Sequence, residues 1–162
     1  MRIKGIKKLN AHMNKFLSPF GLKCTFGSDF AYWTESELIQ YTIFLHQDSD
    51  IYFSDFIKKE FNFSVSDIFL VSLLHEVGHY YTIDDFEEDE LLNDELIKDD
   101  LSNDQQITEK ERNFRYFSLP VEYAATEWAI NFLKDNPNIY HQWGIMLEHF
   151  RHFYKKNNIS LD

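Results

Sequence analysis

One run of the chain constrains the fold more than any other. Residues 66–81 are apolar almost throughout, yet they contain two histidines and a glutamate. Apolar residues cover nearly every side of a helix of this length, which is typical of a helix buried in the middle of a domain. An unpaired histidine or glutamate in such a helix is costly. The run therefore predicts a central helix whose polar residues, His75, Glu76 and His79, share a partner.

Residues 75–79 have the sequence HEVGH, which is an HExxH motif. Residues four apart lie on the same face of a helix, so both imidazoles can bind one ion at about 2.0–2.1 Å. The intervening Glu76 can reach a metal-activated water and act as general base. The single cysteine, Cys24, excludes a zinc cluster built on cysteines, so the ligands must be histidine and carboxylate. The motif predicts Zn²⁺ bound by His75 and His79, with Glu76 as the catalytic residue.

A third protein ligand is expected farther along the chain. Glu122 and Glu127 both lie in a helix predicted over residues 119–134, and their spacing of five points them in different directions. Glu122 shares its face with small residues that let two helices approach closely, whereas Glu127 shares its face with polar and charged residues. We therefore expect Glu122 to be the third metal ligand and Glu127 to be a surface carboxylate.

The remaining elements are predicted from hydrophobic spacing and turn residues. Further helices are expected over residues 3–17, 51–60 and 139–156. Ser64 or Ser66 is the expected cap of the central helix, and Ser118 that of the helix over 119–134. Strands are expected over residues 22–26, 30–34 and 39–46, with a turn at 27–29. These elements predict one α+β domain, residues 1–162, in which a small antiparallel sheet packs against a helical set.

The net charge of -11 is concentrated in an acidic segment at about residues 84–111, which contains thirteen acidic residues and two lysines. The rest of the chain is neutral, so there is no basic surplus for direct nucleic-acid binding. The segment is expected to be a solvated insertion. Two functional alternatives stay open: a lid that favours basic substrates, or a surface that docks a partner or mimics nucleic acid.

Hydrolysis at a metal site needs a donor that stabilises the oxyanion. The sequence offers several tyrosines and histidines without the geometry to choose among them: Tyr80, Tyr81, Tyr123, His141, His149 and His152. A group that orients one of the ligating imidazoles is also expected. Thr126, one turn from Glu122, is a candidate for this role, and ordinary packing is its alternative.

The HEVGH motif is followed by ExxAxxWA, which begins at Glu122. Over about residues 66–134 this pattern resembles the ImmA/IrrE family of metallopeptidases. The resemblance implies a compact zincin-like fold, the two motif histidines and Glu122 as zinc ligands, and Glu76 as the catalytic acid and base. It also implies a regulatory protein as substrate, since the usual targets of that family are transcriptional repressors of mobile elements or stress responses.

The expected function is that of a zinc metallopeptidase, a hydrolase that cleaves peptide bonds in a protein or peptide substrate with Glu76 as general base. The alternative is a catalytically weak or silent zincin-fold binding module that contacts a partner through its acidic segment. A purely structural zinc would require a fourth protein ligand. The basic start is followed by no apolar stretch of signal-peptide or membrane-span length, and the lone cysteine fits a reducing compartment. The expected location is therefore cytoplasmic, with no membrane partner.

Overall fold

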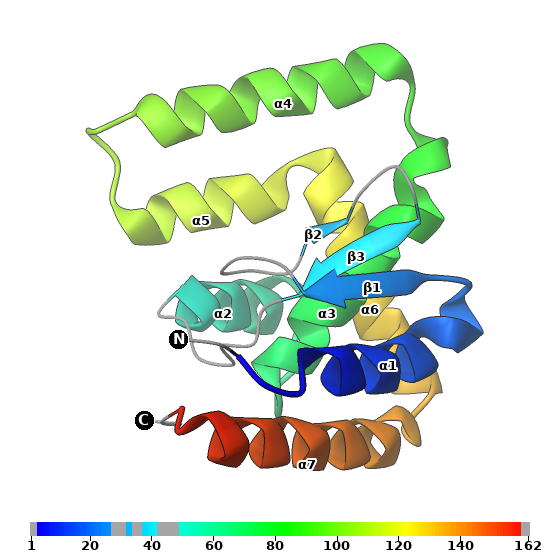
Figure 1. Ribbon diagram of the computed structural model, residues 1–162. Coiled ribbons are helices and arrows are strands. Elements are labelled where there is room, and N and C mark those ends of the chain that lie inside the picture. The colour runs from blue at the N-terminus through cyan, green and yellow to red at the C-terminus, as the bar shows by residue number, and fades with distance from the viewer. Residues whose placement is uncertain (1–2, 27–31, 34–36, 42–48, 160–162) are drawn as a thin grey trace. The chain divides into compact units, whose positions relative to one another are not determined.

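The computed structural model describes residues 3–26, 32–33, 37–41 and 49–159. These residues are mostly helical and include one small sheet (Figure 1). The chain divides into two compact units. The terminal unit comprises residues 1–46 and 133–162, and the central unit comprises residues 47–132. No helix among the described residues is long and apolar enough to cross a membrane.

The terminal unit is built from both ends of the chain. Its elements are α1 (Ile6–Leu17), the 3-10 helix η1 (Ser18–Phe20), β1 (Lys23–Phe26), β2 (Tyr32–Trp33), β3 (Leu38–Tyr41) and α7 (Ile139–Asn157). The helices predicted over 3–17 and 139–156 are thus confirmed in position. Gly21 ends η1 with φ 73, a left-handed conformation that favours glycine.

The sheet is mixed, with the strand order β1-β3-β2. β1 pairs with β3 in parallel, with Lys23 opposite Leu38, and β2 pairs with β3 antiparallel. The predicted antiparallel sheet is therefore wrong for the β1–β3 pair. β1 pairs with the strand after next, so β3 lies between β1 and β2 in the sheet. The turn predicted at 27–29 and residues 42–46 of the third strand lie outside the described residues.

α1 packs against both β1 and α7 (Figure 1). Two asparagines one turn apart on α1 bond the strand: Asn10 Nδ2 donates to the carbonyl of Cys24, and the amide of Cys24 donates to Asn14 Oδ1. The Phe16 and Trp143 rings meet edge to face, with their centroids 5.2 Å apart. Burial raises the pKa of the Cys24 thiol to about 12, so this cysteine is an inert core residue.

The central unit is helical. Its elements are α2 (Ser49–Phe61), α3 (Ile68–Thr82), the 3-10 helix η2 (Ile83–Asp85), α4 (Glu88–Asn103), α5 (Glu109–Ser118) and α6 (Pro120–Asp135), whose last three residues belong to the terminal unit. The helices predicted over residues 51–60, 66–81 and 119–134 correspond to α2, α3 and α6. α3 is buried along most of its length, as its apolar character predicts.

Both predicted helix caps are wrong. α3 starts two residues later than expected, and the side chain of Asp67 accepts a hydrogen bond from the amide of Leu70 at 3.0 Å. Ser118 is the last residue of α5, and its hydroxyl donates to the carbonyl of Phe114. The sequence contains suitable cap residues at neighbouring positions, and only the observed helix start decides which one is used.

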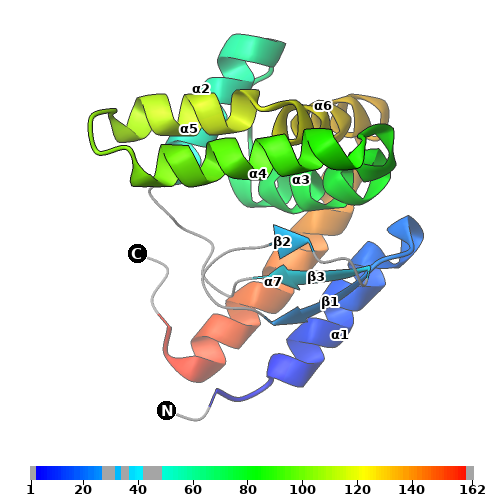
Figure 2. The same cartoon turned by 90° about the horizontal axis from the view of Figure 1, so that it is seen from above.

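The acidic segment forms η2, α4 and the start of α5, and α4 and α5 lie side by side as a helical hairpin (Figure 2). A capping box between Glu87 and Glu90 begins α4. Its outer residues are exposed, as expected of a solvated insertion, but Asp94 is only 3% exposed. Asp94 Oδ2 accepts a hydrogen bond from the amide of Val121 at 3.0 Å, which satisfies a free N–H group in the first turn of α6. The hairpin is therefore attached to the helix that carries Glu122.

Candidate metal centre

Three predicted ligands meet in the central unit. His75 and His79 come from α3 and Glu122 from α6, and one ligand atom from each lies within 4.8 Å of the others. Glu122 Oε2 lies 2.9 Å from His75 Nε2 and 3.2 Å from His79 Nε2. Ligands of a tetrahedral zinc ion lie about 3.3 Å apart at normal bond lengths. The three side chains can therefore hold a metal ion with small adjustments.

The close approach of α3 and α6 makes this geometry possible. Gly78, inside the motif, faces Ala125, and a Cβ atom at Gly78 would lie 2.4 Å from the carbonyl oxygen of Ala125. Ala125 and Ala129 are fully buried. The small residues expected on the Glu122 face do permit close packing, and Gly78 supplies the matching surface on α3. This close approach of the two backbones brings the side chain of Glu122 to both histidines.

Thr126 fixes the proton position on His75. The Thr126 hydroxyl donates to the carbonyl of Glu122 at 2.9 Å, and it lies 3.0 Å from His75 Nδ1. The single proton of the Thr126 hydroxyl is used in the bond to the Glu122 carbonyl. The hydroxyl oxygen therefore accepts a hydrogen bond from His75, and His75 Nδ1 carries the hydrogen. In the neutral ring, Nε2 then presents a lone pair toward Glu122 Oε2, which is also an acceptor. Two acceptors 2.9 Å apart require a cation, either a proton or a metal ion, between them.

The second carboxylate oxygen of Glu122 has a partner of its own. Lys98 on α4 places its Nζ 2.8 Å from Glu122 Oε1, and Glu95 Oε1 lies 2.8 Å from the same ammonium. Glu122 is 2% exposed. Burial raises the pKa of Glu122, but the hydrogen bonds from His75 and His79 outweigh it, so the pKa stays well below its usual range. The carboxylate is therefore ionised in the folded protein and available to a metal.

Lys98 is held in its charged form by the same contact. Burial lowers the pKa of Lys98, but the charge of Glu122 and the hydrogen bonds to Glu122 and Glu95 raise it above its ordinary value. Lys98 belongs to the acidic segment, and nothing in its sequence distinguishes it from Lys110, which is exposed. Sequence reasoning missed it because an insertion with thirteen acids gives no sign that one of its lysines faces the site.

Tyr116 on α5 is a second group that sequence reasoning missed. Its ring lies 5.5 Å from Lys98 Nζ, and Glu122 acts on the pKa of its hydroxyl. Burial, followed by the negative charges of Glu122 and Glu76, raises the pKa of Tyr116. The phenol is thus protonated at neutral pH and can donate a hydrogen bond. Its signal in the sequence is faint because α5 was not predicted as a helix.

The charge of Glu76 acts on other groups of the site. Its negative charge raises the pKa of both His79 and Tyr116. For His79, burial lowers the pKa, but its hydrogen bond to Glu122 and the negative charges of Glu122 and Glu76 together raise it. Glu76 is half-buried rather than buried, so it can contact solvent or a substrate.

The other candidates named from the sequence have different surroundings. Glu127 is exposed, as expected, and Tyr81 stacks on Trp128 with a centroid distance of 5.0 Å. Tyr123 packs against Phe61 at 5.0 Å, which is a core contact. The three histidines of α7, His141, His149 and His152, belong to the terminal unit.

Aromatic rings surround His75 and lower the local dielectric. Phe53 and Phe117 meet its ring edge to face at 5.5 and 5.9 Å, and they stack on each other at 4.2 Å. Charges in such surroundings interact more strongly than in water.

No protein-family model, no curated protein and no solved structure matches this chain.

Proposed function

We propose that this protein is a zinc-dependent metallopeptidase of the ImmA/IrrE type, with a zincin-like fold. The observation that carries the proposal is the convergence of His75 Nε2, His79 Nε2 and Glu122 Oε2, with the His75 proton held on Nδ1 by Thr126. Two imidazoles and one carboxylate suit zinc, and three protein ligands are typical of catalytic rather than structural zinc sites. Among the described residues, the metal-binding group has these three members.

Zinc, when bound, supplies Lewis acidity and lowers the pKa of a water molecule to about 7. The residues around it then divide the remaining work. Glu76, next to the first ligand, accepts the proton of the attacking water and returns it to the leaving amine. Thr126 keeps His75 in the tautomer that binds metal. Lys98 holds Glu122 Oε1, so that Oε2 is the oxygen presented to the ion.

Tyr116 is the donor that this proposal assigns to the developing oxyanion. Its raised pKa keeps the phenol protonated, and its ring lies 5.5 Å from the Lys98 ammonium that holds Glu122. A hydrogen bond aimed at that charge can contribute 10²–10³-fold to the rate, roughly as other oxyanion donors do. The proposed substrate is a protein or peptide, with a regulatory protein as the expected kind.

The test compares hydrolysis of a fluorescence-quenched peptide library by zinc-loaded wild type and by Glu76→Gln. The variant keeps the size of the side chain and removes the base, so a loss of roughly 10²–10⁴-fold is expected with zinc content unchanged. Glu60→Gln, an exposed position on α2, is the matched control and should have wild-type activity. Activity that survives Glu76→Gln undiminished would contradict the proposed mechanism.

The alternative function is a binding module that uses the acidic hairpin. It is favoured by the exposed carboxylates of α4 and α5, which can attract a basic partner. A wild-type protein that binds zinc but cleaves no peptide or protein would favour this alternative over the peptidase.

A further inference from the structure

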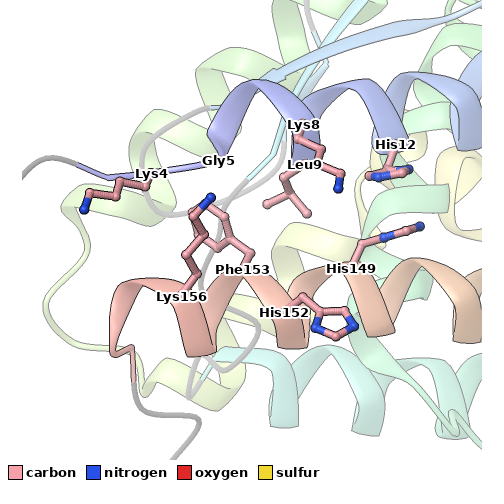
Figure 3. Close-up of a pocket in the computed structure, with 9 residues that line it drawn as sticks. All are labelled: Lys4, Gly5, Lys8, Leu9, His12, His149, His152, Phe153 and Lys156. Carbon is pink, nitrogen blue, oxygen red and sulfur yellow. The ribbon is translucent and has the colours of Figure 1, made fainter.

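The terminal unit has a pocket of about 410 Å³ between α1 and α7 (Figure 3). Six of its nine lining residues are basic: Lys4, Lys8, His12, His149, His152 and Lys156. None of the nine is acidic. Leu9 and Phe153 add a buried apolar floor. A volume of this size is within the range of small-molecule sites, roughly 300–1,000 Å³.

The charge of this pocket is the reverse of the charge of the chain. The whole protein has a net charge of -11, but the terminal unit contains ten Lys and Arg against six Asp and Glu. The central unit has six basic residues and twenty-one acidic ones. Five of the seven histidines belong to the terminal unit. The basic pocket is therefore a local concentration of positive charge within an acidic protein.

The lysines of the pocket lack negative partners within the part of the chain that the structure describes. No ion pair there joins Lys4, Lys8 or Lys156 to a carboxylate. Helix α1 begins at the same place, with no side-chain cap and no acidic residue in its first turn. Lys156 Nζ would lie 3.9 Å from a Cβ atom at Gly5. An ammonium group beside the positive end of a helix is unfavourable unless an anion lies between them.

Two of the histidines that line this pocket stack on each other. The rings of His12 and His149 stack with their centroids 3.4 Å apart and an angle of 10° between them. His12 Nε2 is buried and has no hydrogen-bond partner. Burial lowers the pKa of His149, and the charges of His12, Lys8, His152 and Lys15 lower it further. A bound anion reverses this repulsion and gives the imidazoles an acceptor.

We propose that this pocket binds a small organic phosphate with at least two phosphate groups. The lysines and the start of α1 would bind the phosphate oxygens, the stacked histidines would donate to them when protonated, and Leu9 and Phe153 would contact the organic part. An extended nucleic acid is disfavoured because the net charge of -11 repels a long polyanion, whereas a small ligand interacts mainly with the pocket. The pocket belongs to the terminal unit and the metal centre to the central unit, and this proposal does not depend on the proposed function.

The test is calorimetric titration of the full chain with ATP and with inorganic pyrophosphate, in EDTA so that no metal bridges them. The double variant Lys8→Glu, Lys156→Glu removes pocket charge. Its matched control, Lys7→Glu, Lys155→Glu, makes the same charge change at the neighbouring exposed residues of the same two helices. We expect the pocket variant to bind about tenfold more weakly or worse, and the control to stay within about threefold of wild type.

Three results would overturn the proposal. The first is an absence of binding by the wild type at millimolar ligand. The second is an equal loss of ligand affinity in both double variants, which would show that only the net charge of the protein matters. The third is tighter binding of a single-stranded oligonucleotide than of ATP, which would make the surface a nucleic-acid site. Circular dichroism verifies folding, and Lys8→Ala, Lys156→Ala replaces the reversal variant if that variant is unfolded.

Discussion

Histidines gather in both units of this protein, but their neighbours differ. In the central unit, His75 and His79 face the buried carboxylate of Glu122 at 2.9 and 3.2 Å. In the terminal unit, His12 and His149 stack on each other among lysines, in a pocket whose lining has no carboxylate. The same side chain is thus prepared for a cation in one place and for an anion in the other. The presence of one buried glutamate accounts for the difference.

The two units also differ in how tightly their helices pack at glycine. Gly78→Ala would drive a Cβ atom into the backbone of Ala125, so we expect a loss of about 1–3 kcal/mol in the free energy of unfolding and a displaced Glu122. Gly144 on α7 has nothing within 4 Å of its added Cβ. Gly144→Ala should therefore stabilise by up to about 1 kcal/mol through helix propensity. Urea unfolding of both variants measures the contrast, and equal effects would contradict the close packing of α3 on α6.

The two lysines of the acidic segment provide a sharper test within the central unit. Lys98→Met removes the partner of Glu122 Oε1, and we expect it to destabilise the protein by about 1–3 kcal/mol. Lys110→Met, an exposed position on α5, should change the free energy of unfolding by less than about 0.5 kcal/mol. Thermal unfolding of the metal-free protein compares them. Two indistinguishable variants would show that Lys98 is an ordinary surface lysine.

Thr126 tests whether the tautomer of His75 matters. Thr126→Val keeps the shape of the side chain but removes the acceptor of the Nδ1 hydrogen, and we expect metal affinity to fall about 10–100-fold. Thr126→Ser keeps the hydroxyl and should bind within a few-fold of wild type. Competition with a chelator measures both dissociation constants. A valine variant with wild-type affinity would restrict Thr126 to a packing role.

The sequence predicted the clustering of His75, His79 and Glu122 because helix periodicity is enough to place these side chains. Two motif histidines share a face of α3 at a spacing of four, and helix-face reasoning separates Glu122 from the exposed Glu127. Both arguments depend only on local geometry. The same reasoning predicted α1, α2, α3, α6 and α7 to within a few residues.

The features that the sequence did not predict depend on long-range contacts. Lys98 reaches Glu122, and Tyr116 lies beside Lys98, because α4 and α5 form a hairpin attached to α6, and no local pattern encodes that attachment. The parallel pairing of β1 with β3 is non-local for the same reason. The sequence does not predict the basic pocket because its residues come from two segments far apart in the chain. Each segment contributes only a few basic residues.

The central claim is that Glu122 completes a metal site with the two motif histidines. Its most direct test is the zinc content of purified protein after exposure to limiting zinc, compared between Glu122→Ala and Glu127→Ala, two glutamates of the same helix. The account predicts about one zinc per chain in wild type and in Glu127→Ala, and a large loss in Glu122→Ala. Full zinc occupancy in Glu122→Ala, or an equal loss in both variants, would contradict it.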